Sequence, residues 1–527
     1  MLTLSPSDLG LPPKFSSWRQ YQDHAIETAW DSEVRFVGMN QPTGSGKSLA
    51  YMALASLLGR TCVLTSTKAL QDQLLADFSP IGLADIRGRA NYPCHLKRGM
   101  TCDEGADAHC HHRFTQQAYP PCPYAVALEK ARNAPLVVTN YAYWILQNEH
   151  GGGLGSFKLL VLDEAHAAMD EVCGALSMEL TSYELYRMLQ ARVPEPEDMV
   201  EAWRELAQRR LPFAQRTLDE QGSLIRSGYG DDQDLKEFRS WKKLVTKLLR
   251  LAGISDTGNW IVEAVPHGHR ITPIWPAPFT RSRLFLDVPR VVMVSATLTR
   301  KTLELLGVPQ DESAFTTYPS VFPARHYPLI HIPTVRVDHR WTPGDRRKWM
   351  ERIDEILGAR LDRKGIIHSV SYERAREIEE DSEYSAVMLL HDSKGAAETV
   401  AGFKTAGPPS VLVSPSVGTG HDFPYSACEF QIISKVPWPD CRTPLMAARV
   451  RADPAYRQHV MCQGLVQSCG RGMRAVDDRC ENFIVDDHIR GVLATCRSEL
   501  PQWFRRLYRM EEEIPKAPPR MFNGGMP

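Results

Sequence analysis

The strongest pattern in the chain is an eight-residue stretch near its N-terminus, Gln41-Pro42-Thr43-Gly44-Ser45-Gly46-Lys47-Ser48. An apolar run, Arg35–Asn40, precedes it, and a helix-forming apolar run, Leu49–Leu58, follows it. A glycine-rich loop between a strand and a helix lets backbone N–H groups converge on phosphate oxygens. Lys47 would then reach the β- and γ-phosphates, and Ser48 would hold Mg²⁺. We therefore predict a phosphate-binding loop (P-loop) whose ATP-binding residues are Thr43, Gly44, Ser45, Gly46, Lys47 and Ser48.

Charge and composition narrow the class of protein. The 527 residues include 62 Lys and Arg against 63 Asp and Glu, for a formal charge of −1, with 43% hydrophobic and 24% charged residues. This composition excludes a disordered chain, and the charge excludes a bulk polycation while leaving room for a local basic channel. At about 150 residues per domain, the chain holds roughly three to four domains. We find no secretory signal and no apolar run of about 18 residues, so we expect a cytoplasmic protein that contacts no membrane.

Two series of short apolar runs predict two parallel α/β sheets, because strands buried on both faces are apolar throughout and alternate with helices. The first series is Arg35–Asn40, Thr61–Thr65, Leu136–Thr139, Lys158–Leu162 and Arg290–Val294. The second is Gly365–Ser369, Ala386–Leu390, Ser410–Val413, Phe430–Lys435 and Asn482–Val485. Residues 178–265 differ: they have helical spacing and little strand signal, which predicts a helical insertion.

A second nucleotide-binding pattern follows the fourth apolar run. Lys158–Leu162 leads directly into Asp163-Glu164-Ala165-His166. A strand that ends in Asp-Glu places both carboxylates at the carboxyl edge of a sheet, where α/β proteins bind ligands. We expect Asp163 to anchor Mg²⁺ and Glu164 to orient or deprotonate the attacking water. An isolated Asp-Glu pair is as often a helix cap, but the upstream P-loop favours the catalytic interpretation.

The P-loop together with Asp163-Glu164-Ala165-His166 resembles a superfamily II helicase. Val294-Ser295-Ala296-Thr297-Leu298 matches the third motif of that superfamily, which links the ATP site to the DNA site. Residues 467–474 fit the Gln-x-x-Gly-Arg-x-x-Arg of its sixth motif. The resemblance implies catalytic roles for His166 and Gln467. It also implies that Arg471 and Arg474 are arginine fingers, which stabilise charge on the γ-phosphate.

A finer resemblance is to the iron–sulfur XPD/DinG-like DNA helicases, and it extends from Trp18 to Ile489. The matching segments are Arg19 with Gln22, Gly88-Arg89-Ala90-Asn91-Tyr92-Pro93-Cys94, Cys122-Pro123-Tyr124, Gly420-His421-Asp422-Phe423-Pro424 and Lys435-Val436-Pro437-Trp438-Pro439. This resemblance implies that Arg19 and Gln22 contact adenine. It also implies that Gly420 and Asp422 belong to the ATP site.

The same resemblance implies an order of domains. We expect a first RecA-like motor domain in three parts, residues 1–86, 135–177 and 266–312. An iron–sulfur cluster domain at 87–134 and a helical Arch-like domain at 178–265 would interrupt it. The second RecA-like motor domain is expected at 313–527. The expected fold class is therefore α/β, with two P-loop motor domains of which the first carries both insertions.

Four cysteines lie between the two nucleotide-binding patterns, and we call residues 87–134 the cysteine segment. Cys94, Cys102, Cys110 and Cys122 are separated by seven, seven and eleven residues. Four thiolates bind a [4Fe–4S] cluster or Zn²⁺, and the spacing alone leaves cluster, zinc and free thiols open. A mixed zinc site could also use His95, His109, His111 and His112. The resemblance favours a [4Fe–4S] cluster held by the four cysteines.

Two loops are candidates for contact with a nucleic-acid strand. Thr65-Ser66-Thr67-Lys68 follows an apolar run in the first predicted domain, and Ser369, Ser371 and Tyr372 follow one in the second. Hydroxyl groups in such loops donate to phosphates. Each of these residues taken singly is as well explained as a solvated side chain or a helix cap.

The predicted function is that of an ATP-dependent DNA helicase with ATP, Mg²⁺ and a [4Fe–4S] cluster as cofactors. The resemblance implies 5′→3′ movement on single-stranded DNA and unwinding of duplex or forked DNA by a monomer. Protein partners are not identifiable from the residues. Two alternatives stay open: a DNA-stimulated ATPase subunit of a repair or defence complex without processive unwinding, and an RNA-acting helicase.

Overall fold

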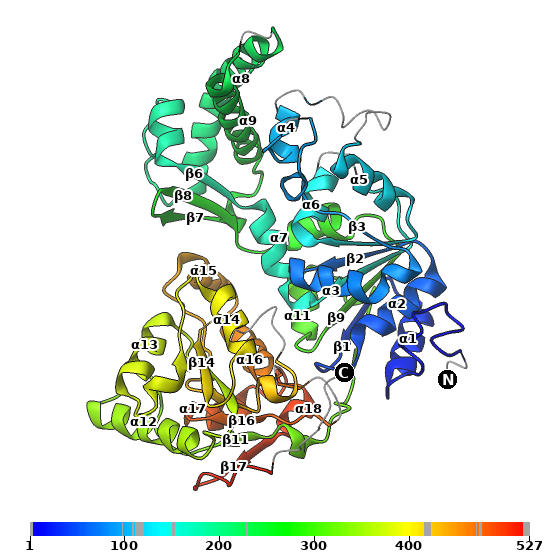
Figure 1. Cartoon of the computed structure of the whole chain (residues 1–527). Helices are drawn as coiled ribbons and strands as arrows, with labels where there is room; N and C mark the ends of the chain where they lie inside the picture. The colour runs from blue at the N-terminus through cyan, green and yellow to red at the C-terminus, as the bar shows by residue number, and fades with distance from the viewer. Residues whose placement is uncertain are drawn as a thin grey trace.

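The structure is a computed structural model, and it describes residues 4–96, 98–107, 110, 121–149, 153–227, 230–415, 423–470, 472–473 and 477–519. Two parallel α/β domains lie side by side, and a region that ends in two long helices projects from the first of them (Figure 1). No helix within the described residues is both long and apolar enough to cross a membrane.

The first domain is built on a parallel sheet with the strand order β10-β1-β9-β5-β2-β4-β3. Its strands are β1 (Phe36–Asn40), β2 (Thr61–Thr65), β3 (Leu83–Asp85), β4 (Leu136–Asn140), β5 (Leu159–Asp163), β9 (Arg290–Ser295) and β10 (Ser313–Thr317). The five central strands confirm the predicted runs to within one residue at each end. The edge strands β3 and β10 were not predicted, because an edge strand is short and only partly buried. Strand β10 also extends this domain past the expected boundary at residue 312.

Helices cover both faces of the first sheet. One face packs Val37, Val63 and Val161 against α1 (Gln22–Trp30), α2 (Lys47–Leu58) and α3 (Lys68–Phe78). The other face packs against α5 (Pro123–Asn133), α6 (Tyr141–Glu149), α7 (Ala168–Leu176) and α11 (Arg300–Leu305). Because the sheet is covered on both sides, its functional groups gather at the carboxyl ends of the strands.

The second domain repeats this architecture with the strand order β13-β14-β12-β15-β16-β11-β17, again all parallel. Its strands are β11 (Leu329–His331), β12 (Lys364–His368), β13 (Met388–Leu389), β14 (Ser410–Ser414), β15 (Phe430–Ile433), β16 (Glu481–Ile484) and β17 (Tyr508–Met510). Its helices are α12 (Pro343–Gly358), α13 (Tyr372–Asp381), α14 (Ala396–Thr405), α15 (Pro444–Ala452), α16 (Tyr456–Cys469), α17 (His488–Thr495) and α18 (Gln502–Arg505). All five predicted runs form strands here. The edge strands β11 and β17 were again not predicted.

The projecting region, residues 178–273, has its own core. Its long helices α8 (Val200–Arg226) and α9 (Asp232–Ala252) pack through Trp203, Leu244 and Leu248, and a capping box at Asp231 begins α9. The expectation of a purely helical insertion was incomplete. A three-stranded antiparallel sheet of β6 (Met178–Thr181), β7 (Trp260–Val265) and β8 (Gly268–Pro273) forms its foot. The sheet was missed because its strands are short and 86 residues separate β6 from β8, the strand with which it pairs.

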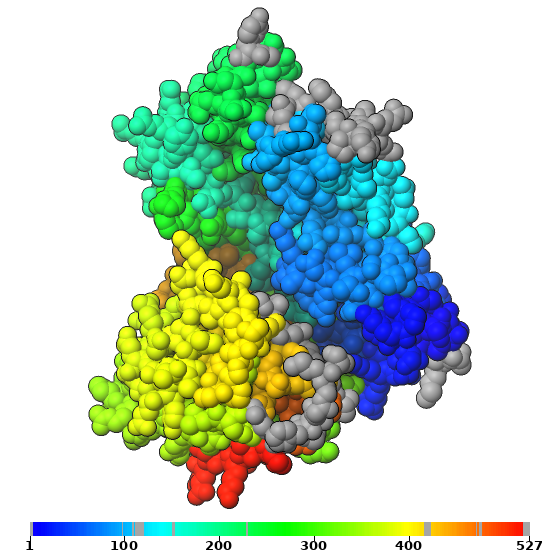
Figure 2. Space-filling view, in the orientation of Figure 1, coloured from blue at the N-terminus to red at the C-terminus, as the bar shows by residue number. Residues whose placement is uncertain are grey.

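The cysteine segment contacts the projecting region. Its helix α4 (Cys102–Asp107) lies beside α9 (Figure 1), where Lys242 pairs with Asp107 and Arg239 Nη2 donates to the Glu104 carbonyl oxygen at 2.6 Å. The space-filling view shows the surface hollowed between the green helices, the blue first domain and the yellow second domain (Figure 2). The cysteine segment, the first domain and the projecting region therefore meet around one recess.

Candidate nucleotide site and strand-contact loops

The P-loop places a helix N-terminus at the carboxyl edge of the first sheet. Gly44 and Gly46 have φ angles of 76° and 78°, in the left-handed region where a side chain is strained. A Cβ at Gly46 would lie 2.2 Å from the Gln22 amide nitrogen, and one at Gly44 would lie 2.5 Å from the Phe322 ring. Helix α2 begins directly at Lys47. The glycines are therefore required both for the turn and for the close approach of its neighbours.

Arg19 and Gln22 hold the P-loop from behind. Arg19 Nη1 donates to the Gly44 carbonyl oxygen at 2.6 Å, and Gln22 Nε2 donates to the carbonyl oxygens of Ser45 (3.2 Å) and Gly46 (2.9 Å). Gln22 Oε1 accepts from the Arg19 backbone N–H at 2.6 Å, and Gln22 is only 2% exposed. In this conformation both polar atoms of the Gln22 amide already have hydrogen-bond partners in the protein, Nε2 in the P-loop and Oε1 at Arg19. Contact of this pair with adenine stays a prediction.

The two carboxylates of the second pattern lie opposite the P-loop lysine. Asp163 is the last residue of β5, and Glu164 follows it with a φ of 48°. The Lys47 ammonium lies 3.2 Å from Glu164 Oε1. Burial raises the pKa of the Asp163 carboxyl to about 6, and the adjacent Glu164 carboxylate adds to the rise. Burial acts on Glu164 too, but Lys47 and His166 outweigh it and hold the pKa of Glu164 well below its usual value. Glu164 is therefore ionised at neutral pH.

Tyr51 is a site residue that the sequence patterns did not indicate. Its hydroxyl donates to Asp163 Oδ2 at 3.3 Å from one turn inside α2. Burial, with the Asp163 charge, raises the pKa of Tyr51 well above its usual value, so the phenol stays protonated and keeps donating. The signal that could have found it is its position: Tyr51 lies four residues after Lys47, on the same face of the helix.

A chain of hydrogen bonds runs from Glu164 to the second domain. Ser295 Oγ lies 3.0 Å from Glu164 Oε2 and 2.8 Å from His166 Nδ1. In the second domain, Gln467 Nε2 donates to Thr297 Oγ1 at 3.1 Å and lies 3.5 Å from His166 Nε2. Residues from three predicted motifs thus meet across the boundary between the two domains, although 301 positions separate His166 from Gln467.

Arg471, Arg474, Gly420 and Asp422 lie outside the described residues. The described residues of the sixth motif do touch the P-loop. A Cβ at Gly470 would lie 2.8 Å from Thr43 Oγ1, and one at Gly44 would lie 3.4 Å from the Met473 carbonyl oxygen. The described residues Gly470 and Met473 therefore lie against the P-loop.

Ser45 and Ser48 complete the P-loop. Within the described chain, Ser45 Oγ is buried with no hydrogen-bond partner, which leaves a polar atom unsatisfied in the loop that would cradle phosphates. Ser48 lies close enough to Tyr51 for its hydroxyl to bond with the phenol and moderate the rise of the Tyr51 pKa. Contact of these two hydroxyls with a nucleotide and its Mg²⁺ stays a prediction.

The four cysteines are buried, and Cys94 and Cys110 lie beside Gly105. A Cβ at Gly105 would lie 2.4 Å from Cys94 Sγ and 3.8 Å from Cys110 Cβ, while Cys102 Sγ lies 3.9 Å from Cys122 Sγ. Among the described residues, no three Cys, His, Asp or Glu side chains are arranged to hold a metal ion. A [4Fe–4S] cluster takes one thiolate on each of four irons, so its ligands surround the cluster and need not meet at one ion. The binding of a [4Fe–4S] cluster or of Zn²⁺ by these cysteines stays a prediction. Of the proposed zinc-binding histidines, His109, His111 and His112 lie outside the described residues.

The two predicted strand-contact loops have the same construction. Thr65 Oγ1 donates to the Thr67 carbonyl oxygen at 3.2 Å, and Ser369 Oγ donates to the Ser371 carbonyl oxygen at 3.1 Å. Thr67 and Ser371 then cap α3 and α13 by accepting from the backbone N–H three residues on. Thr65 and Ser369 are buried and hold the turns. Lys68, Val370 and Ser371 are exposed at the surface of the loops, and Ser66 and Tyr372 are half-buried.

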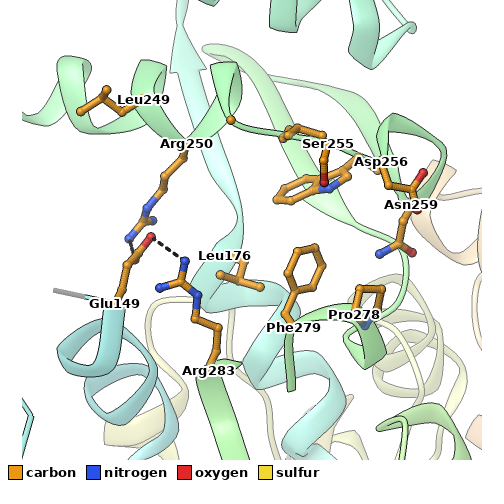
Figure 3. Close-up of a pocket in the computed structure, with 13 residues that line it drawn as sticks. Glu149, Leu176, Leu249, Arg250, Ser255, Asp256, Asn259, Pro278, Phe279 and Arg283 are labelled. Carbon is orange, nitrogen blue, oxygen red and sulfur yellow. Dashed lines mark hydrogen bonds and ion pairs between the residues drawn. The ribbon is translucent and has the colours of Figure 1, made fainter. Parts of the chain in front are cut away.

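A pocket of about 550 Å³ lies where the projecting region joins the first domain (Figure 3). The Glu149 carboxylate forms ion pairs with Arg250 of α9 and with Arg283. The rings of Trp260 and Phe279 form part of the wall, 5.7 Å apart and edge to face. These contacts fix the end of α9 to the first domain.

Comparison with known proteins finds relatives along most of the chain. Residues 15–191 match a family model described as the res subunit of type III restriction enzymes, and residues 365–507 match that of a helicase C-terminal domain. The ATP-dependent DNA helicase YoaA of Haemophilus influenzae (strain ATCC 51907 / DSM 11121 / KW20 / Rd) is 23% identical over 567 residues, which cover 85% of this chain and 87% of that protein.

Two solved structures share the fold. The structure titled "XPD_Helicase" has a TM-score of 0.60 at 14% identity and covers 91% of this chain and 98% of its own. S. tokodaii Xpd4 has a TM-score of 0.59 at 12% identity, with coverage of 94% and 100%. At these identities the similarity is evidence of the fold alone.

The two parallel α/β domains, with a P-loop, an Asp-Glu-Ala-His segment and a cross-domain hydrogen-bond chain, define a superfamily II helicase protein. Within that superfamily the chain is XPD/DinG-like, since the domain matches, the YoaA relative and the XPD folds agree. ATP and Mg²⁺ are consistent with this class.

Proposed function

We propose that the protein is an ATP-dependent DNA helicase that moves 5′→3′ on single-stranded DNA and unwinds duplex or forked DNA. The observation that carries this proposal is the chain of contacts from Lys47 through Glu164 and His166 to Gln467. It makes the catalytic carboxylate sensitive to the position of the second domain. A two-domain ATPase with that property converts hydrolysis into relative movement of its domains.

The chain's own residues supply the steps of hydrolysis. Lys47 would bind the β- and γ-phosphates, while Ser48 and Asp163 would hold Mg²⁺, which neutralises charge as the γ-phosphoryl group transfers. Glu164 would orient or deprotonate the attacking water, because it is ionised and held by Lys47 and Ser295. Arg471 and Arg474 are proposed to stabilise the transferring group from the second domain.

Single-stranded DNA is proposed to lie across both domains. The loops that end in α3 and α13 sit at the carboxyl edges of the two sheets. Ser66, Lys68 and Tyr372 are proposed to meet phosphates or bases there, and Lys68 would exchange its bond to Asn91 Oδ1 for one to a phosphate. Because the two loops belong to different domains, a change in domain spacing would shift one DNA contact relative to the other.

A [4Fe–4S] cluster on Cys94, Cys102, Cys110 and Cys122 is proposed as a structural cofactor. It would cross-link a segment that has few regular elements of its own. The burial of all four side chains and the 3.9 Å between the Cys102 and Cys122 sulfur atoms support this assignment.

Unwinding polarity is the experiment that tests the function. The purified protein, with ATP and Mg²⁺, is offered duplexes with a 5′ tail, a 3′ tail or a fork, and matched RNA versions. We expect unwinding of the 5′-tailed and forked DNA and none with a 3′ tail. ATP hydrolysis stimulated by single strands without unwinding would instead identify a DNA-stimulated ATPase. Preferential action on the RNA substrates would identify an RNA-acting helicase.

A further inference from the structure

Helix α15 belongs to the second domain by sequence but packs into the first. Met446 and Val450 on α15, with Tyr456 just after it, join the apolar core that covers one face of the first sheet. The helix also lies against β7 at the foot of the projecting region (Figure 1). One short helix of the second domain therefore touches both the first domain and the projecting region.

Arg449 is the central contact of this helix. Its guanidinium is buried, with a side chain only 3% exposed, and Nη1 lies 2.7 Å from Asp170 Oδ1. Nε donates to the Ile274 carbonyl oxygen at 2.9 Å, and Nη1 donates to the Tyr456 hydroxyl at 3.1 Å. The planar fork is also within 6 Å of the Trp275 and Tyr456 ring centres, at 5.8 Å and 5.6 Å. No shorter or unbranched cation could make this set of contacts at once.

Both ends of α15 are held as well. At its N-terminus, Glu263 Oε1 of β7 accepts from the Leu445 backbone N–H at 3.1 Å. A carboxylate at this position satisfies a free N–H group and complements the helix dipole. At its C-terminus, Asp453 pairs with Lys301 of α11 at 2.8 Å. The helix is thus anchored at its start, middle and end, each time to a residue outside the second domain.

The anchor points connect the nucleotide site to the projecting region. Asp170 lies in the first turn of α7, six residues after Glu164. Ile274 directly follows β8, the last strand of the projecting region, and Lys301 lies four residues after Thr297 of the hydrogen-bond chain. Movement of α15 with the second domain would therefore act on the catalytic segment and on the projecting region together.

We propose that Arg449 is a positioning residue that couples closure of the nucleotide cleft to movement of the projecting region. The pair with Asp170 fixes α15 to the helix that follows the catalytic carboxylates, and the bond to Ile274 fixes it to the foot of the projecting region. When the second domain approaches the first, the projecting region follows. This inference rests on the proposed ATP-driven cycle and adds a route by which that cycle reaches the recess beside the cysteine segment.

Asp170→Asn is the variant of choice, because Asp170 is 69% exposed and the fold tolerates the change. The matched control is Glu179→Gln, which removes an exposed carboxylate from its pair with Arg270 inside the foot sheet, where no domain boundary is crossed. A second variant, Arg449→Lys, keeps the charge and loses the fork. We expect Asp170→Asn to keep nucleotide affinity and melting temperature while DNA stimulation of ATP turnover falls about three- to fivefold.

Two dye distances read out the coupling directly. Dyes on exposed positions Asp31 and Glu380 report the spacing of the two domains, and dyes on Asp31 and Glu220 report the projecting region. They are attached through non-natural amino acids because the chain has 12 cysteines. In the unchanged protein and in Glu179→Gln, ADP with beryllium fluoride should change both distances. In Asp170→Asn and Arg449→Lys only the first should change, and the double variant should be no worse than either single one.

Each other outcome overturns the inference in a distinguishable way. A projecting region that still follows the cleft in Asp170→Asn and Arg449→Lys would show that Arg449 does not couple them. A cleft that closes in the unchanged protein while the projecting region stays still would refute the coupling and leave the proposed function intact. If the nucleotide mimic left the Asp31–Glu380 distance unchanged in the unchanged protein, the proposed ATP-driven cycle would be contradicted, and the inference would fall with it.

Discussion

Lys47 and Glu164 form the ion pair at the centre of the nucleotide site, with 3.2 Å between their charged groups. A γ-phosphate would compete with Glu164 for the lysine, so binding of ATP frees the carboxylate to meet water. The same two side chains therefore serve both the resting site and the reacting one.

Lys47→Ala tests this pair. We expect ATP turnover to fall at least about 100-fold, because one preorganised charge on the transferring group is lost. Steady-state phosphate release measures the effect, and circular dichroism confirms that the fold is kept. Lys14→Ala, at an exposed lysine that pairs with Asp77 of α3, is the control. A Lys47→Ala protein with normal turnover would refute the P-loop assignment.

Glu171 provides a pH-dependent test at the residue scale. Burial raises its pKa from the usual 4.5 to about 7, and Asp170 adds to the rise. The folded protein thus binds this proton more tightly than the unfolded chain, so stability falls as pH rises from about 4.5 to 7 and is flat above that. Allowing for partial exposure, the loss is about 1–2 kcal/mol.

Glu171→Gln should abolish that loss. We expect the variant to melt at a higher temperature than the unchanged protein at pH 8, and at a similar temperature at pH 5, in thermal unfolding followed by circular dichroism. An equal difference at both pH values would mean that Glu171 has an ordinary pKa in the folded protein.

At the scale of elements, the cysteine segment depends on the starts of two helices. Cys102 begins α4 and Cys122 caps α5, and their sulfur atoms lie 3.9 Å apart. A cluster at this position would fix α4 to α5, and α4 in turn contacts α9 through Asp107. The proposed cofactor and the projecting region are therefore linked through one short helix.

Cys102→Ser tests that link. Anaerobically purified protein should be brown with about four iron atoms per chain, and the variant should lose most of the iron. Hydrogen exchange of α4 should rise, because its tie to α5 is gone. Cys441→Ser, at a half-exposed cysteine of the second domain, should change neither measurement. A colourless protein that contains zinc would refute the cluster assignment.

At the scale of the whole molecule, the nucleotide site is complete only when both domains are in contact. Gln467 supplies the amide that reaches Thr297 and His166. Gln467→Ala should therefore leave ATP binding intact while turnover falls about three- to tenfold, as expected for one lost hydrogen bond in the reacting arrangement. Gln463→Ala, which removes the weaker 3.4 Å contact with Thr302 one turn earlier, is the matched control. An equal effect of both changes would argue for general loosening of the interface.

Local sequence patterns predicted most of the central strands of both large sheets and few of the strands at their edges. Central strands such as β2 and β5 are buried on both faces, so their apolar runs identify them without reference to the rest of the chain. Edge strands such as β10 and β17 are short and half exposed, and nothing in their composition separates them from loops. The foot sheet of the projecting region was missed because β6 pairs with β8, and their paired residues run from Thr181 with Gly268 to Met178 with Ile271.

The residues of the nucleotide site and of its contacts also divide into those that the sequence predicted and those that it did not. Lys47, Asp163 and Glu164 were predictable because their chemistry depends on a short segment: a glycine turn, a helix start, a strand end. Tyr51 and Arg449 were not predicted: only the four-residue spacing from Lys47 points to Tyr51, and nothing in its own neighbourhood marks Arg449. Each acquires its role from a partner more than 100 residues away. The bracing of the P-loop by Gln22 likewise appears only once α1 is packed against α2.

The amino-acid sequence by itself determined the class of the two α/β domains, the P-loop, the catalytic carboxylates and the four grouped cysteines. These follow from hydrophobic periodicity and from backbone chemistry that acts over a few residues. Only the tertiary structure decided the order of the strands, the meeting of His166 with Gln467 and the insertion of α15 into the core of the first domain. Such contacts join residues distant in sequence, and they are selected by how whole surfaces pack rather than by any local preference.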